Sequence, residues 1–326
     1  MTDFIEATGA RYETSGSVIY RTETSVTAST ATLLAYFKAI SGQKVLSGQH
    51  AYDALGGTQL QQINQIIAAT GQAPAIVGVF LSRPFSSFDE SQSVATANYW
   101  LSQGGLVFVS IVPGNPSLGP VMEPGASPST TVNFANILIP ATTEYNNWQT
   151  YLAQLVTIFK SINGPVLFRP FPEVNETWGW WQSQDPGTFI TIWQQMHAYL
   201  ATNGVNNVLW VYNVGSDESN NTTYLATGYV DILSLDAYPP NPGNFAHVIG
   251  QFQQLGYPVM YAEMGMTPGS PTFFGDNSQL LATVQTFSPS VFAVVVWDDN
   301  DALPNQNGMG AFMSNPKIVN RSGLPH

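Results

Sequence analysis

Two glutamates are the residues of this chain best placed to do chemistry. Glu173 lies in the segment GPVLFRPFPEVNETWGWWQ (164–182), which opens with a short apolar run typical of a strand and continues with Arg169 and three tryptophans. Glu263 ends the segment PVMYAE (258–263). Indole faces stack on the C–H face of a pyranose, and an apolar wall raises the pKa of a neighbouring carboxyl group. The grouping around Glu173 therefore suits sugar chemistry.

The tryptophans have a simpler interpretation as core residues. Trp178, Trp180 and Trp181 would each, taken alone, more often be buried, because tryptophan is highly buried on average. Their grouping beside a carboxyl group favours a functional interpretation, since charged residues are seldom buried without a partner. Arg169 is a fixed cation that can hold neighbouring carboxylates in place.

The composition excludes several classes of partner. The 326 residues contain 9 basic and 21 acidic side chains, a net charge of −12, and only 9% are charged. Phosphate binding needs clustered Lys and Arg, so we expect neither nucleic acid nor an anionic membrane as a partner. The chain has no cysteine, which excludes thiol catalysis and disulfides. No segment has the ~20 consecutive apolar residues of a membrane span.

The beginning of the chain shows no secretion signal, because MTDFIEATGARYE lacks a basic start and an apolar stretch. The abundance of Ser, Thr, Asn and Gln with few lysines resembles secreted polysaccharide-degrading enzymes. We therefore expect a secreted, extracellular protein whose leader is not visible here. We further expect a monomer.

Eight apolar segments alternate with segments of helical periodicity. Continuous Val/Ile/Leu runs are typical of parallel strands covered on both faces. Eight β/α units predict a single-domain (β/α)₈ barrel over residues 1–326, with residues 1–24 as an irregular arm packed on it. An open doubly wound sheet is less favoured, because no Gly-rich phosphate motif follows the first strand. The predicted strands are 44–50, 75–81, 105–112, 165–171, 207–214, 230–238, 258–265 and 291–299. The predicted helices are 24–40, 58–70, 91–103, 147–162, 186–203, a short turn near 218–226, 244–256, 277–287 and a last segment near the end.

Polar residues collect where these strands end. Active sites of such barrels lie at the C-terminal ends of the strands. The residues at those ends are Gln49, His50, Ser110, Asn115, Arg169, Glu173, Tyr212, Asn213, Asp236, Tyr238, Glu263, Trp297, Asp298 and Asp299. We expect the hydroxyl of Tyr238 to donate a hydrogen bond to Glu263, because the strands before them are neighbours.

Two carboxyl groups over one rim are what glycoside hydrolysis requires. One protonates the leaving oxygen and the other attacks the anomeric carbon, and in a retaining enzyme the two groups lie ~5–5.5 Å apart. The alternative for Glu263 is a structural ion pair with Arg169 or Arg83. The four histidines lack metal-site spacing, so we expect no metal and no cofactor.

The chain resembles glycoside hydrolase family 26, whose members are mostly β-mannanases. The family segment RPxHExNGSWFWWG is similar to RPFPEVNETWGWWQ (169–182). Its SWHxxNP is similar to SIVPGNP (110–116), its SGQ strand to SGQH (47–50), its nucleophile segment to YAEMG (261–265) and its strand-six Tyr to Tyr238. The resemblance implies a retaining endo-glycosidase with Glu173 as acid/base and Glu263 as nucleophile.

Three positions depart from the family pattern. The family's histidine before the acid/base is Pro172 here, and the tryptophan and histidine of SWHxxNP are Ile111 and Val112. The family residues shape the subsite where the sugar is cleaved, so β-1,4-mannan is the expected substrate but a β-1,3-1,4-glucan or a β-1,3-xylan stays open. A sugar-binding protein without hydrolysis is the alternative from another class. The expected substrate-binding residues are Arg169, Asn175, Trp178, Trp180, Trp181, Tyr238, Trp297, Asn115, Gln49 and His50.

Overall fold

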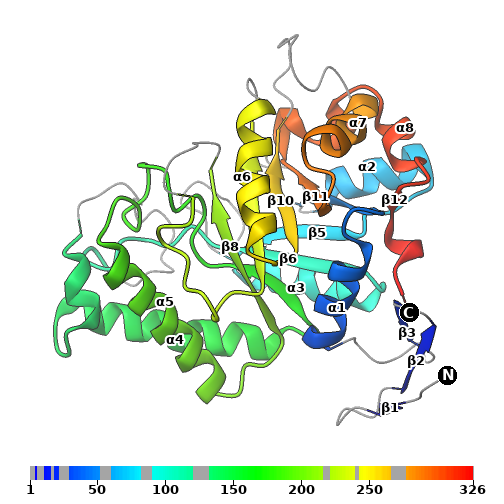
Figure 1. Cartoon of the computed structure of the whole chain (residues 1–326). Helices are drawn as coiled ribbons and strands as arrows, with labels where there is room; N and C mark the ends of the chain where they lie inside the picture. Colours follow the sequence, from blue (N-terminus) through cyan, green and yellow to red (C-terminus); the bar gives the residue numbers. More distant parts are fainter. Residues whose placement is uncertain are drawn as a thin grey trace.

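The fold is described from a computed structural model of the chain (Figure 1). The structure describes residues 4–5, 11–15, 18–21, 29–51, 60–81, 90–119, 132–215, 221–238, 242–265 and 277–325. Arg83 lies outside these residues, as do parts of the loops that follow several strands.

Eight parallel strands form a closed barrel, as the sequence predicts. Each pairs with the next along the chain, and the last, β11, pairs with the first, β4, through Ala293–Val296 and Leu46–Gln49. The strands are buried along almost their whole length, which explains why they read as continuous apolar runs. They are β4 (Val45–His50), β5 (Ile76–Phe80), β6 (Leu106–Ser110), β7 (Val166–Arg169), β8 (Val208–Val214), β9 (Ile232–Ala237), β10 (Val259–Met264) and β11 (Val291–Val296).

Helices surround the barrel and lie between most pairs of successive strands (Figure 1). Their ends follow from local chemistry. Ser29 and Thr142 each cap a helix by accepting a hydrogen bond from the backbone amide three residues further on. Gly71 ends another helix in the left-handed conformation. The helices are α1 (Thr30–Ile40), α2 (Gln61–Thr70), α3 (Glu90–Ser102), α4 (Thr143–Ser161), α5 (Pro186–Thr202), α6 (Pro242–Gln254), α7 (Asn277–Phe287) and α8 (Met309–Met313).

Three details differ from the sequence prediction. The segment near the N-terminus is not irregular: β1 (Phe4–Ile5), β2 (Arg11–Ser15) and β3 (Val18–Arg21) form a small antiparallel sheet, and β3 contacts α1. Residues 221–224 form turns and no helix. A short strand, β12 (Ile318–Val319), pairs with β4 after the barrel has closed. Such short segments carry too little periodicity to be recognised.

Alternate strand residues fill two separate cores. Leu46, Phe108 and Leu167 point into the barrel, while their neighbours Val107 and Val166 pack against the helices. Helix α1 closes the N-terminal end of the barrel, where Phe37 stacks on Phe292 with ring centroids 4.4 Å apart. Because all eight strands are parallel, their polar C-terminal ends collect at the opposite rim.

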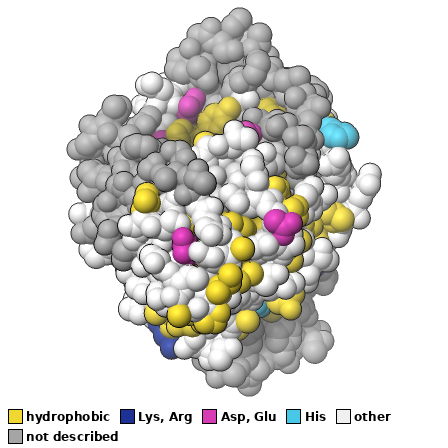
Figure 2. Space-filling model, turned by 90° about the vertical axis from the view of Figure 1, so that its left-hand side faces the viewer, with side chains coloured by type: hydrophobic (Ala, Val, Ile, Leu, Met, Phe, Trp, Pro, Cys, Tyr) yellow, Lys and Arg dark blue, Asp and Glu magenta, His cyan; other side chains and the backbone are white. Residues whose placement is uncertain are grey.

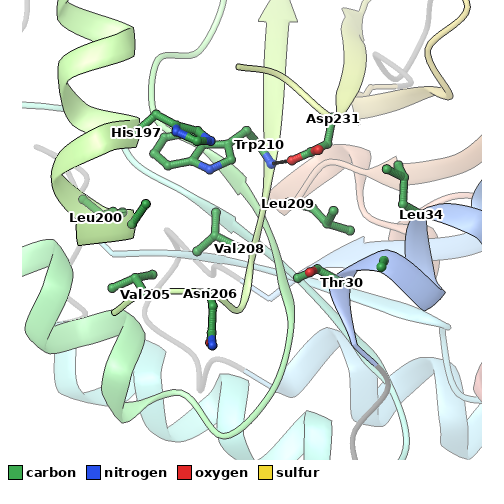
Figure 3. Close-up of a pocket in the computed structure, with 12 residues that line it drawn as sticks. Thr30, Leu34, His197, Leu200, Val205, Asn206, Val208, Leu209, Trp210 and Asp231 are labelled. Atoms are coloured by element: carbon green, nitrogen blue, oxygen red, sulfur yellow. Dashed lines mark hydrogen bonds between the residues drawn. The ribbon is translucent and has the colours of Figure 1, made fainter. Parts of the chain in front are cut away.

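A cavity of about 450 Å³ lies at the closed end, between α1, α5 and the beginning of β8 (Figure 3). Its walls are mainly apolar, and His197 and Asp231 lie at one side of it. It contains none of the residues predicted to act on a sugar. The polar residues at the strand ends lie at the other end of the barrel.

The surface agrees with the charge-poor composition. On the face in Figure 2, and among the residues that the structure describes, acidic side chains are scattered and basic ones are visible at the lower edge. None of the described helices is long and apolar enough to span a membrane.

Candidate active site

Arg169 is the centre of a buried polar network at the C-terminal rim of the barrel. It is the last residue of β7 and is fully buried. Its Nη1 donates to Asp236 Oδ2 at 2.7 Å, its Nη2 to Glu263 Oε1, and its Nε to Ser110 Oγ at 2.7 Å. Burial lowers the pKa of the guanidinium, but the charges of Asp236 and Glu263 more than offset this, so Arg169 stays charged.

Glu263, in β10, has both carboxylate oxygens bonded. Arg169 donates to Oε1, and Tyr238 Oη donates to Oε2 at 2.7 Å, as the sequence predicts. Gly265 lets the Tyr238 ring lie there, since a Cβ at this position would come within 2.3 Å of Cδ1 of the ring. Burial and the charge of Glu263 raise the pKa of Tyr238, so it remains a donor. These two donors hold the Glu263 carboxylate in place at the rim.

The ion pair between Arg169 and Glu263 is the structural alternative that the sequence left open. It is present, but Glu263 is 8% exposed and lies at the rim, where its charge acts on Glu173. An ion pair with only a structural role would need neither an exposed carboxylate nor a second carboxyl group nearby. Glu263 has both, which favours a functional role for it.

The backbone of Glu173 adopts an uncommon conformation. Its φ of 48° lies in the left-handed region, which is costly for a residue with a side chain. Hydrogen bonds hold it there: its amide donates to Asn213 Oδ1 at 2.7 Å, and its carbonyl accepts from the Gln182 side chain and from the Glu176 amide. Strain kept in place by surrounding contacts is a feature of functional sites.

The surroundings of the Glu173 carboxyl group favour its protonated form. Burial, and then the charge of Glu263, raise its pKa to about 7. Trp178 and Arg169 act in the opposite direction. The site thus holds one carboxyl group poised to give up a proton near neutral pH and one held by two donors, which is the arrangement needed for an acid and a nucleophile.

The three tryptophans do not share one environment. Trp178 is 36% exposed, and its Nε1 donates to Glu173 Oε2 at 2.6 Å. It is therefore a hydrogen-bond donor to Glu173 as well as an apolar wall. Trp180 and Trp181 are 3% and 0% exposed and donate to the carbonyls of Pro113 and Pro172. Since other rings cover these two, Trp178 is the indole of the three with an exposed face.

At the end of β4 the predicted residues differ in their surroundings. The amide of Gln49 is fully buried: it donates to the Trp297 carbonyl at 2.7 Å and accepts from the Leu303 amide at 2.8 Å, so it ties strand ends together. His50 is also buried, with Nε2 2.9 Å from the Ala262 carbonyl. Its ring packs against Trp297, which is half-buried, with centroids 5.0 Å apart.

The two predicted asparagines organise loops. Asn115 is fully buried, and its Oδ1 accepts from the Ser117 amide at 2.8 Å. Asn175 accepts from the Gly215 amide at 2.7 Å and joins the Glu173 loop to the end of β8. Both contacts position the backbone near the site.

Asn213 is a member of the site that the sequence placed at a strand end but did not assign. Its Oδ1 accepts from Glu173 N and, at 3.4 Å, from Arg169 Nη1. Its Nδ2 donates to Asp236 Oδ1 at 2.8 Å and to Ser234 Oγ at 3.0 Å. It joins the loop of Glu173 to the network around Arg169. The sequence feature that could have identified Asn213 is its position at the end of β8, the strand that follows β7 along the chain.

Among the described residues, no group of three His, Asp or Glu side chains could hold a metal ion.

A (β/α)₈ barrel with two carboxyl groups on its C-terminal rim is the architecture of a glycoside hydrolase. The family model described as Glycosyl hydrolase family 26 matches residues 22–321. The chain belongs to this family.

Curated relatives are similar over most of the chain. A mannan endo-1,4-β-mannosidase of Bacillus subtilis is 26% identical over 322 residues, covering 89% of this chain and 85% of that protein. Mannan endo-1,4-β-mannosidase A and B of Caldalkalibacillus mannanilyticus is 29% identical over 245 residues, covering 70% of this chain and 47% of that protein. The chain thus spans about half the length of the second relative.

Solved structures show the same fold. The YdhT protein of Bacillus subtilis has a TM-score of 0.78 at 21% identity, covering 91% of this chain and 94% of that one. A mannanase of Bacillus subtilis has a TM-score of 0.77 at 22% identity, covering 89% and 91%. The agreement confirms the barrel.

Proposed function

We propose that this protein is a retaining endo-β-1,4-mannanase in which Glu173 is the acid/base and Glu263 the nucleophile. The single observation that carries the proposal is the unequal treatment of two carboxyl groups on one rim. Glu263 accepts from two donors, Arg169 and Tyr238, whereas burial and the charge of Glu263 keep Glu173 protonated up to about pH 7.

The proposed reaction has two steps. In the first, Glu263 attacks the anomeric carbon while Glu173 gives its proton to the departing glycosidic oxygen. The glycosidic bond breaks, and a covalent glycosyl-enzyme forms. In the second step, the Glu173 carboxylate takes a proton from water, the water oxygen attacks the same carbon, and Glu263 is released. Two displacements at one carbon retain the anomeric configuration.

The second step depends on the first. Once Glu263 is esterified, its negative charge no longer raises the pKa of Glu173. Glu173 has just lost its proton and can then act as a base. The carboxyl separation of ~5–5.5 Å expected for a retaining enzyme stays a prediction.

Mannan is the proposed substrate because the similar proteins are named mannan endo-1,4-β-mannosidases. We also propose that the enzyme is secreted and monomeric and acts on a polysaccharide or oligosaccharide. Pro172 and Val112 stand where the family pattern has histidine, and this favours tests on a mixed-linkage β-glucan and a β-1,3-xylan as well.

A panel of polysaccharides tests the proposal. Purified protein is incubated with locust-bean mannan, barley β-glucan and β-1,3-xylan, and released reducing sugar is measured. We expect release from mannan, with the β-anomer formed first when the products are followed by proton NMR. The variant Glu263→Gln is the matched control and should release none. Binding to mannan without release from any polymer would contradict the proposal and favour a sugar-binding protein.

A further inference from the structure

Gln182 is a buried polar residue at the end of the segment that carries Glu173, and the proposed reaction gives it no part. Its side chain is 2% exposed. The family segment has glycine at this position, and it has phenylalanine where this chain has Gly179. The contacts that the Gln182 side chain makes are therefore not part of the family pattern.

The Gln182 side chain bridges two backbone groups. Its Nε2 donates to the Glu173 carbonyl, and its Oε1 accepts from the Gly179 amide. These partners fix the orientation of the side-chain amide, because turning it over would place oxygen against the carbonyl and nitrogen against the N–H group. The backbone amide of Gln182 also donates to the Gly179 carbonyl at 3.2 Å. One residue thus closes the turn at 179–182 and ties it to the backbone of Glu173.

Left-handed backbone lies at both ends of this segment. Glu173 has a φ of 48°, and Ser183, directly after Gln182, has a φ of 56°. This conformation is costly for residues with a side chain, and it persists only where surrounding contacts hold it. The Gln182 side chain is one of the contacts that hold it, since it bonds the carbonyl of one strained residue and directly precedes the other.

The other end of the bridge supports the indole that bonds Glu173. A Cβ at Gly179 would lie 2.6 Å from Cη2 and Cζ2 of Trp181, so this indole rests on bare backbone. The Trp181 ring meets that of Trp178 at 87°, with centroids 4.9 Å apart. Trp178 in turn donates to Glu173 Oε2 at 2.6 Å. The turn that Gln182 closes therefore also supports the donor to the carboxyl group.

The bridge thus holds the acid from two sides. It fixes the carbonyl of Glu173 itself, and it fixes the amide directly after Trp178, whose indole bonds the carboxyl group. A general acid acts only within hydrogen-bond reach of the atom that takes its proton, ~2.6–3.2 Å. A displacement of about 1 Å can cost roughly 100-fold in rate. A side chain that restrains both groups is therefore suited to set where the proton is delivered.

We propose that Gln182 is a positioning residue that acts through Glu173: the bridge between Gly179 and Glu173 places the carboxyl group where it can give its proton to the departing glycosidic oxygen. The inference rests on the proposed function, since it takes Glu173 as the acid. Gln182 itself does not touch the reacting atoms.

A comparison of two substrates tests the inference. On mannohexaose, kcat/KM depends on proton donation, because the leaving group is a sugar. On a dinitrophenyl β-mannobioside it does not, because dinitrophenolate departs without a proton. Q182M keeps the length of the side chain and removes its amide. It should lose roughly 10- to 100-fold in kcat/KM on mannohexaose and stay within about twofold of the wild type on the aryl glycoside. The later role of Glu173 as a base does not enter, since kcat/KM covers only the steps up to the glycosyl-enzyme.

Q182G is the second variant. With the side chain removed, water can reach the Glu173 carbonyl and the Gly179 amide, so these groups are not left buried without a partner. Q182G should separate the two substrates in the same way as Q182M. The matched control is Q184M, because Gln184 Nε2 donates to the Trp180 carbonyl at 2.8 Å in the same loop. This bond does not involve Glu173, so Q184M should keep kcat/KM on both substrates.

The possible outcomes separate this inference from the proposed function. If the wild type hydrolyses none of the three polymers, the proposed function fails and the inference falls with it. If the wild type is active and the folded Gln182 variants lose kcat/KM equally on both substrates, or on neither, the inference fails alone. Circular dichroism establishes which variants fold. Should neither fold, the role of Gln182 would be structural, and this result too would overturn the inference.

Discussion

The hydroxyl of Tyr238 lies 2.7 Å from Oε2 of Glu263 and donates to it, from a ring that rests on Gly265. The two residues are 25 positions apart, at the ends of neighbouring strands β9 and β10. This bond holds one of the two oxygens of the carboxylate, and Arg169 holds the other.

Tyr238→Phe should lower kcat without unfolding the protein. A hydrogen bond to a charged group contributes about 1.5–3 kcal/mol, so we expect a loss of roughly 10- to 100-fold in kcat on mannan. The ring that packs on Gly265 is kept, so circular dichroism and the melting temperature should stay close to those of the wild type. Kinetics equal to the wild type would remove Tyr238 from the site.

Glu263→Ala should abolish hydrolysis of every substrate, because no glycosyl-enzyme can form. The loss in kcat should be roughly 10⁴-fold or more. Azide can occupy the vacated space and attack the anomeric carbon directly, so added azide should restore activity on an aryl mannoside. The glycosyl azide should have the inverted configuration, as measured by NMR. A retained product would show that Glu263 is not the nucleophile.

Glu173→Ala should fail differently. Aryl glycosides with good leaving groups depart without a proton, so measurable activity should remain on them while activity on mannan is lost. Azide should accelerate this variant by attacking the glycosyl-enzyme, and the product should have the retained configuration. Full activity on mannan would rule out Glu173 as the acid.

The activity profile should fall as pH rises through about 7. The pKa of Glu173 is raised to about 7 by burial and by the charge of Glu263, and the acid works only while it is protonated. Activity is therefore present below that pKa and is lost above it, which places the optimum below neutrality. A profile of kcat/KM that peaks above about pH 8 would contradict this assignment, since a raised catalytic Glu titrates near ~6–7.

Trp178→Phe should move the same limb to higher pH. Phenylalanine keeps an aromatic face but loses the Nε1 donor, and this donor favours the ionised form of Glu173. The pKa of Glu173 should therefore rise. Trp193→Phe is the control, because it removes an indole donor that bonds to the Tyr229 carbonyl. If both variants give the profile of the wild type, the bond from Trp178 has no effect on the acid.

Much of the fold could be predicted because its pattern is local. Eight apolar runs identify eight strands, and the strand order of a β/α barrel follows the chain, so the sequence alone brings Glu173 and Glu263 to one rim. The small sheet of β1–β3 and the strand β12 were missed, because two to five residues carry no usable periodicity.

Residue type and position along the chain were therefore enough to predict which residues form the site: the two carboxyl groups, Arg169 at the end of its strand, and the tyrosine that faces Glu263. Only the tertiary structure decided what each of them touches. Three neighbouring tryptophans are alike in the sequence, yet packing buries Trp180 and Trp181 and leaves Trp178 exposed as a donor to Glu173. Likewise, Asn213 joins Glu173 to Arg169 across two strands. Burial and hydrogen bonding depend on contacts between distant segments, and a linear pattern does not contain them.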